Sequence, residues 1–149
     1  MESLAIRLRE RSYCNALHSY RVFEQRVESM VEPGCTLLLD TGCGRTVPVL
    51  RKFLGKAARL IGVELVEFTD VPPGNEAHNS DLGRLPLPDA SVDVVMSRSV
   101  FEHLTDPASV YRELARMLCP GGWYFRPPTS GTTAAWWPAW CPTASMPGW

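Results

Sequence analysis

Three consecutive leucines run into an aspartate and then a glycine-rich turn at Leu37–Gly44. An apolar run of this kind is typical of a short strand buried on both faces, as in a parallel sheet covered by helices. Glycines let the chain turn sharply and let a ligand lie against bare backbone. In open sheets of this type, ligands bind at the carboxyl ends of the strands. The segment therefore predicts a buried strand with a candidate binding loop directly after it.

Apolar runs alternate with helical patterns along the rest of the chain. Strands are predicted at about 36–40, 60–64 and 91–97, with a fourth beginning at 123; residues 69–80 lack a good strand pattern, so that sheet edge is expected to be short or missing. A first helix is predicted at 12–31, and a second at about 46–54, with Thr46 as its cap and Gly55 at its end. A third is predicted to begin at Pro107 after the cap Asp106 and to be stopped by Pro120-Gly121-Gly122. This alternation implies right-handed crossovers and a mainly parallel sheet.

Composition excludes several classes of function. The 149 residues fit one domain, and a net charge of -1 gives no reason to propose nucleic acid or an anionic membrane as partner. No apolar stretch approaches the roughly 18 residues of a membrane span, and residues 1–10 lack the apolar region of a signal peptide. The five cysteines include no Cys-x-x-Cys pair, which argues against a zinc site or a disulfide framework and favours reduced thiols in the cytoplasm.

The last part of the chain has a different character. Residues 127–149 contain no Asp, Glu, Lys or Arg, yet hold four of the five tryptophans and five of the thirteen prolines. Neither helical nor strand periodicity is present, so we expect an irregular tail. We hypothesise that this tail is an out-of-frame translation, which sequencing of the gene would test.

Five motifs between about residues 35 and 126 resemble those of class I S-adenosylmethionine-dependent methyltransferases, in particular the small-molecule type (methyltransferase type 11-like). They are Leu39–Gly44, Gly62–Glu64, Asp81 with Leu85–Asp89, Ser91–Val95 leading into Ser99–Leu104, and Leu118–Gly122. The family's third loop glycine is replaced here by Thr46, a residue that can cap a helix.

The resemblance implies an α/β fold with a doubly wound, mainly parallel, Rossmann-like sheet of seven strands. Here the sheet is expected to be incomplete at its C-terminal edge, because only the uncharged tail follows Pro-Gly-Gly. The implied organisation is an N-terminal helical segment (1–34), an S-adenosylmethionine-binding core (35–126) and an irregular tail (127–149), in a chain that is truncated or frameshifted at its C-terminus.

The resemblance also implies cofactor-binding residues on the first two strands. Gly42 and Gly44 would let backbone approach the methionine and ribose parts of S-adenosylmethionine, with Cys43 beside the ligand. Asp40 would hold that loop and the ligand's ammonium group. Glu64 would accept two hydrogen bonds from the ribose hydroxyls, a charge-assisted pairing. The alternative interpretation is that the glycines only form a turn and that Glu64 is an exposed carboxylate at a strand end.

Later motifs imply the remaining contacts. Asp81 would accept a hydrogen bond from the adenine amino group, with Leu82 beside the ring, and Ser97 and Arg98 would border the methionine end. No catalytic residue is assigned, although Arg98 and His103 are candidates on the acceptor side. A second interpretation gives His103 and its neighbour Glu102 a structural role instead of acid–base catalysis, and a structural role is also expected for Asp93.

The predicted reaction is direct methyl transfer from the sulfonium to an oxygen, nitrogen or carbon of a small-molecule acceptor, without a metal or a covalent enzyme intermediate. One alternative is a non-catalytic remnant that binds the cofactor weakly or not at all. Another is a nicotinamide-dependent dehydrogenase, but residues 42–47 lack the third glycine of Gly-x-Gly-x-x-Gly. The acceptor, the pathway and the oligomeric state do not follow from the sequence.

Overall fold

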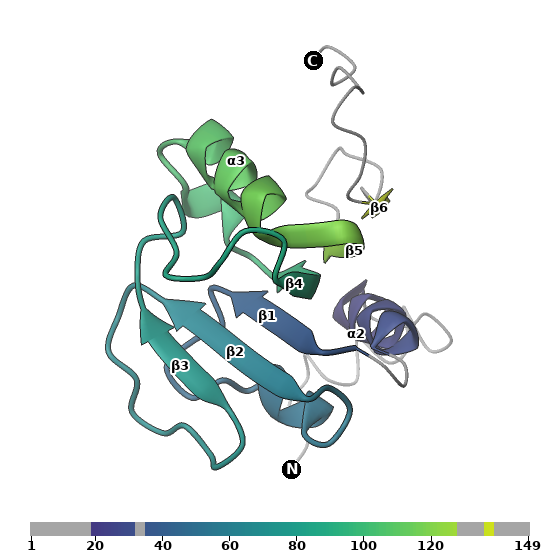
Figure 1. Cartoon of the computed structure of the whole chain (residues 1–149). Coiled ribbons are helices and arrows are strands. Elements are labelled where there is room, and N and C mark those ends of the chain that lie inside the picture. The colour runs from purple at the N-terminus through teal and green to yellow at the C-terminus, as the bar shows by residue number, and fades with distance from the viewer. Residues whose placement is uncertain (1–18, 32–34, 128–135, 139–149) are drawn as a thin grey trace, which may run out of the picture.

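The computed structural model describes residues 19–31, 35–127 and 136–138. They form a six-stranded sheet in the order β3-β2-β1-β4-β5-β6 (Figure 1). The strands are β1 (Leu37–Thr41), β2 (Arg59–Glu64), β3 (Glu76–Asn79), β4 (Val92–Ser97), β5 (Leu118–Phe125) and β6 (Trp136–Pro138). Strands β1 to β5 are all parallel, and β6 is antiparallel to β5. The predicted α/β fold with a doubly wound, mainly parallel sheet is confirmed.

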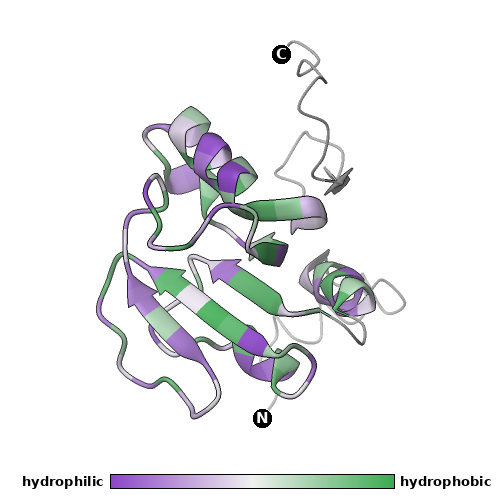
Figure 2. Cartoon of the chain, in the orientation of Figure 1, coloured by the Kyte–Doolittle hydropathy of each residue, from purple (hydrophilic) through white to green (hydrophobic). Residues whose placement is uncertain are grey.

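Helical elements cover both faces of the sheet and bury it between two apolar clusters. Helix α3 (Pro107–Met117) packs on one face through Val110, Leu114 and Met117. Helix α2 (Ser19–Met30) and the 3₁₀ turn η1 (Leu50–Phe53) pack on the other. Figure 2 shows the result: hydrophobic residues dominate the central strands, whereas the edge strand β3 is mostly hydrophilic.

Strand β1 is buried along its whole length, as its leucine run predicts. Its start is fixed by Asp93 of β4, whose Oδ2 accepts hydrogen bonds from the backbone N–H groups of Thr36 (2.8 Å) and Leu37 (2.9 Å). The structural role expected for Asp93 is thereby confirmed. This carboxylate ties the beginning of β1 to β4 and so helps to set the register that brings their far ends together.

The helix predicted at 46–54 is wrong. Val47 has a φ of +44°, outside the helical region, and only the four-residue turn η1 follows; its N-cap is Val49 and no side chain caps it. The apolar residues of this segment are buried all the same, so packing against β2 and α2 is satisfied without a regular helix. Gly55, predicted at the end, does adopt a left-handed φ of +77°.

Helix α3 begins as predicted, with Asp106 Oδ1 accepting the backbone N–H of Ser109 at 3.1 Å and Pro107 in the first turn. It ends earlier than predicted, at Met117, because Leu118 is already extended and pairs with Val92. The next pair is Val94 with Trp123, so the residues between Leu118 and Trp123, including Pro-Gly-Gly, form an irregularity within β5 rather than the stop of the helix.

The two sheet edges also test the sequence predictions. The edge strand expected to be short or missing is present as β3, with four residues parallel to β2. The expectation of an irregular tail is wrong at Trp136–Pro138, which pairs with β5 as β6; the rest of the predicted tail after residue 127 lies outside the described residues. Within the described part of the chain the sheet has six strands, against the seven that the resemblance implies.

Candidate functional site

The strand order itself locates the candidate site. From β1 the chain winds to β2 and β3 on one side, and then crosses to β4 and β5 on the other side of β1. Ligands of open α/β sheets bind at the carboxyl ends of the strands where this reversal occurs, here β1 and β4. Thr41 and Ser97 are paired at that point. The loops that follow them therefore form the candidate site.

The loop after β1 lies directly against β2. The backbone N–H groups of Gly42 and Cys43 both donate to the Val63 carbonyl, at 2.8 and 3.2 Å. Gly42 has a φ of +68° and Gly44 a φ of +75°, conformations that favour glycine. A Cβ on Gly42 would lie 2.2 Å from Val100 Cγ2, so the loop after β4 closes tightly over this glycine. Gly42 is thus covered by Val100, whereas a Cβ on Gly44 would meet only Pro48 Cδ, at 3.8 Å; a larger residue would be strained at either position because φ is positive.

The carboxylate of Glu64 joins the ends of β1 and β2. Its Oε2 accepts the backbone N–H of Gly44 at 3.0 Å, and its Oε1 accepts that of Leu65 at 2.9 Å. The side chain is half-buried, with both oxygens facing backbone donors. This arrangement holds an anionic acceptor pair next to the glycine loop, which fits a ligand that carries two adjacent hydroxyls.

Asp40 is a buried carboxylate on the penultimate residue of β1, only 3% exposed. Burial raises its pKa to about 8 from the usual 3.8; the charge of Arg98 opposes the rise, whereas those of Glu64 and Glu24 add to it. Arg98 follows β4 and forms an ion pair of 3.3 Å with Glu24 of α2. Two of the predicted residues, Asp40 and Glu64, are therefore brought together with Arg98 by the fold.

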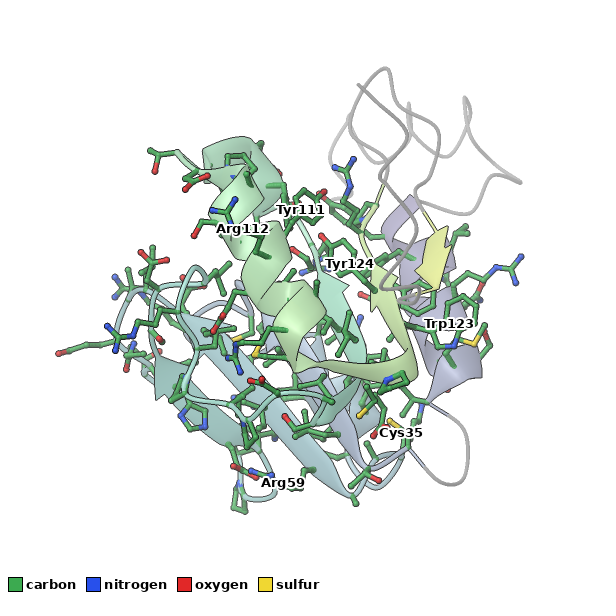
Figure 3. The ribbon with its side chains drawn as sticks, turned by 45° about the horizontal axis from the view of Figure 1, so that its top comes forward. Cys35, Arg59, Tyr111, Arg112, Trp123 and Tyr124 are labelled. Carbon is green, nitrogen blue, oxygen red and sulfur yellow. The ribbon has the colours of Figure 1, made fainter. Side chains whose placement is uncertain are left out.

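Two buried hydroxyls lie at the ends of β4 and β5. Among the described residues, Ser97 Oγ and the Tyr124 hydroxyl make no hydrogen bond of standard geometry, although the two hydroxyls are near enough to interact with each other. Figure 3 shows Tyr124 of β5 beside Tyr111 of α3, with ring centroids 6.0 Å apart, and Phe101 completes this aromatic cluster at 4.7 Å from Tyr111. Burial raises the pKa of the Tyr124 phenol, so this hydroxyl stays protonated. The buried hydroxyl of Ser97 is a polar group that can also hydrogen-bond a ligand at this edge.

The other predicted residues are placed differently. Asp81 is exposed, and its Oδ1 accepts the backbone N–H of Gly83 at 2.7 Å in the turn after β3. Leu82 is buried in the α3-side core. His103 is exposed on the 3₁₀ turn η2 (Phe101–His103). The structure leaves the adenine role of Asp81 and the acceptor-side role of His103 as predictions.

Sequence reasoning gave no site role to four contributors: Tyr20 and Glu24 of α2, and Gly62 and Val100, which it named only as parts of motifs. Gly62 gives a detectable signal, since it stands in the middle of an apolar strand, and a Cβ there would lie 2.7 Å from Cys43 Sγ. The contact of Glu24 with Arg98 spans 74 positions of sequence and has no local signal.

Metal and membrane signals are lacking in the part of the chain that the structure describes. No three His, Cys, Asp or Glu side chains there are grouped to hold a metal ion. None of the described helices has both the length and the apolar character needed to cross a membrane.

Comparison with known proteins places this chain in a family. The family described as "Methyltransferase domain" matches residues 39–125. A "Probable S-adenosylmethionine-dependent methyltransferase" of Mycolicibacterium smegmatis is 39% identical over 90 residues, covering 57% of this chain and 35% of that protein. The 27-O-demethylrifamycin SV methyltransferase of Amycolatopsis mediterranei is 32% identical over 96 residues, with the same two coverages, 57% and 35%.

Solved structures agree on the fold. The crystal structure of the YcgJ protein from Bacillus subtilis superposes with a TM-score of 0.61 at 20% identity, covering 72% of this chain and 50% of that one. At this identity the likeness shows the fold alone. The chain spans about a third of the length of the first curated relatives it matches (35% for the mycobacterial protein).

Proposed function

Since this chain belongs to the methyltransferase domain family, we propose that it binds S-adenosylmethionine at the carboxyl ends of β1, β2 and β4 and transfers its methyl group to a small-molecule acceptor. The observation that carries the proposal is the hydrogen bond from Gly44 N to Glu64 Oε2. This bond holds a carboxylate against a glycine loop near the point where the strand order reverses. An adenosyl ligand needs the carboxylate for its ribose hydroxyls and the loop for close approach to the backbone.

The described residues fit the cofactor's parts. Glu64 offers two anionic oxygens to the ribose hydroxyls, because each oxygen has a further lone pair besides the one that accepts a backbone N–H here. Gly42, Cys43 and Gly44 form the backbone wall of the site, and the buried Asp40 suits an ammonium group. Ser97 supplies a buried hydroxyl at the end of β4, near the hydroxyl of Tyr124.

We assign two further contacts on sequence grounds alone: Asp81 to the adenine amino group and Leu82 to the adenine ring. For Asp81 this requires its carboxylate to leave Gly83 N or to share it. Leu82 is buried in the apolar cluster beneath α3 and is only 6% exposed, so little of its side chain is open to the ring.

The chemistry asks little of the protein beyond positioning. A sulfonium is an activated methyl donor, so the residues named above need only bind and orient it and keep water from the reacting atoms. The acceptor would approach from the ends of β4 and β5, where Phe101, Tyr111 and Tyr124 offer aromatic surface. Small-molecule acceptors suit this apolar, aromatic edge, and a net charge of -1 offers nothing for nucleic acid.

Cysteine usage supports a location in the cytoplasm. Cys35, Cys43 and Cys119 are free thiols in the described structure. Reduced cysteines are the rule in that compartment.

Calorimetric titration with S-adenosylhomocysteine, the product that the methyl donor becomes, tests the proposal. We expect binding in the range of about 1 µM to 1 mM that is usual for enzyme ligands, and none for NAD. Folded protein that gives no binding heat would contradict the proposal and favour a non-catalytic remnant. Retention of NAD instead would favour a dehydrogenase. Transfer itself is followed by formation of S-adenosylhomocysteine with candidate acceptors.

A further inference from the structure

Arg98 is held in place by helix α2, although it belongs to the link after β4. Its guanidinium carbon lies 4.9 Å from the centre of the Tyr20 ring, within the range of cation–π attraction. Its Nη1 donates to Glu24 Oε1 at 3.3 Å. Glu24 is only 17% exposed and Arg98 29%, so this pair is partly removed from water.

The next residue is fixed to the same helix. The hydroxyls of Ser99 and Tyr20 share a hydrogen bond of 2.7 Å. Ser99 has a φ of +57°, a left-handed conformation that a serine adopts only when its surroundings enforce it. Two successive residues after β4 thus depend on two residues one helical turn apart on α2.

Among the described residues, Arg98 uses little of its hydrogen-bonding capacity. A guanidinium carries five N–H donors, and within this part of the chain one of those of Arg98 donates, to Glu24. Arg116 shows the contrast, because its donors go to the carboxylates of Glu113 and Asp89 and to two backbone carbonyls. Arg98 therefore retains donors at the edge where the ligand is proposed to bind.

A carboxyl group and a guanidinium lie at this edge on neighbouring strands. Asp40 of β1 is paired with Met96 of β4, two residues before Arg98, and the positive charge of Arg98 acts on the buried carboxyl group. Burial raises the pKa of Asp40 to about 8, and an ammonium group beside it would favour its ionised form. The two residues are therefore complementary to the ammonium and carboxylate of a free amino acid, which is what the methionine end of the proposed ligand carries.

We propose that Arg98 binds the carboxylate at the amino-acid end of the ligand, and that Tyr20 and Glu24 are positioning residues that hold its guanidinium there. This inference rests on the proposed function, since it assigns a residue to the same ligand. An Arg–carboxylate pair can be bidentate, which gives both strength and geometric selectivity. Helix α2 thereby determines which adenosyl compounds the site prefers.

The test compares two ligands by calorimetry: S-adenosylhomocysteine and its decarboxylated analogue, which keeps the amine and lacks the carboxylate. We expect the native protein to prefer S-adenosylhomocysteine by about ten-fold or more, the usual worth of a charged hydrogen bond. Arg98→Met should reduce this preference to about two-fold or less, and Arg98→Lys should retain part of it because the charge remains. Arg112→Met, an exposed arginine on α3, is the matched control and should leave the preference unchanged.

Variants of α2 separate positioning from simple packing. Tyr20→Phe keeps the ring beside the guanidinium and loses the bond to Ser99, so most of the preference should remain. Tyr20→Leu removes the ring and should lower the preference several-fold, as should Glu24→Gln, which removes the charge of the ion-pair partner. A merely structural role would weaken both ligands equally and leave their ratio unchanged.

The outcomes distinguish this inference from the function on which it rests. If the folded native protein binds neither compound, the proposed function fails. If it binds both and Arg98→Met and Arg98→Lys keep the native ratio, the function stands and the role of Arg98 is refuted. Unfolding curves of each variant establish that the comparison is made on folded protein.

Discussion

The backbone N–H of Gly44 donates a hydrogen bond of 3.0 Å to the side chain of Glu64, so that the loop after β1 and the end of β2 are joined at one carboxylate. The other carboxylate oxygen is held by Leu65 N at 2.9 Å. Both acceptors are therefore fixed in direction before any ligand arrives. This preorganisation reduces the entropy that binding must cost.

The charge of Glu64 is expected to matter more than its shape. Glu64→Gln keeps one oxygen acceptor but removes the negative charge, and it should weaken S-adenosylhomocysteine by roughly ten-fold, the worth of a charged hydrogen bond over a neutral one. Calorimetry on purified variants measures the change. Glu67→Gln, an exposed residue three positions on, serves as the control and should bind as the native protein does. Equal affinity of Glu64→Gln and the native protein would remove Glu64 from the site.

Substitution by alanine should lower the free energy of unfolding by very different amounts at two glycines with similar backbone angles. At Gly55 (φ +77°) a Cβ would meet nothing within 4 Å, so Gly55→Ala should cost only the left-handed conformation, about 1 kcal/mol. At Gly42 (φ +68°) the Cβ would also collide with Val100, which adds about 1–3 kcal/mol of overpacking. Urea unfolding of the two variants measures the difference.

A second substitution identifies the cause of the larger effect. Val100→Ala removes the methyl group that the new Cβ would strike, so the double variant Gly42→Ala/Val100→Ala should recover part of the loss. Equal destabilisation at Gly42 and Gly55 would mean that the loop after β4 does not close over Gly42 in solution.

Asp93 should be important for stability rather than for ligand binding. Its Oδ2 accepts two backbone N–H groups at the start of β1, far from the carboxyl ends of the strands. Asp93→Asn should lower the free energy of unfolding by about 1–3 kcal/mol, because both bonds are to a charged acceptor. The control is Asp70→Asn, which breaks an exposed pair with Arg51 and should cost less than about 1 kcal/mol. A loss of ligand affinity in folded Asp93→Asn would contradict this assignment.

Asp40 should make stability depend on pH. Its pKa is about 8 in the folded protein and 3.8 when exposed, so between these values the folded state holds one proton more than the unfolded state. The free energy of unfolding should therefore fall as the pH rises from about 3.8 to about 8 and change no further above that. Asp40→Asn should lack this component. Urea unfolding of both proteins at about pH 5, 7 and 9 gives the comparison; parallel pH profiles would place the titration elsewhere.

The parts of the fold that follow local rules could be predicted from the sequence. The leucine run before Gly42 gives a buried strand, and Asp106 with Pro107 begins a helix, because each signal acts within a few residues. The segment after Gly44 could not be read in this way. Val47 takes a left-handed φ while remaining fully buried, so tertiary packing overrode the helical spacing of its neighbours.

Contacts between residues far apart in the sequence limit how much of the site could be predicted. Asp40 and Glu64 were identified because each ends an apolar strand, and parallel strands bring their ends to one edge. Nothing near Arg98 in the sequence points to Tyr20 or Glu24, which reach it only because α2 packs across β4 and β5. The strand β6 was missed for a related reason: backbone pairing with β5 requires no side-chain periodicity.

Gly62 leaves room in the middle of β2 for the sulfur of Cys43. The thiol is thereby shielded between loop and sheet, and burial also raises its pKa, so both access and ionisation oppose its alkylation. A maleimide can reach Cys43 only when the loop lifts away from β2. Its labelling rate, followed by peptide mass spectrometry, therefore reports how often the loop opens. The missing side chain at Gly62 of β2 thus makes a thiol in the loop after β1 a probe of that loop's movement.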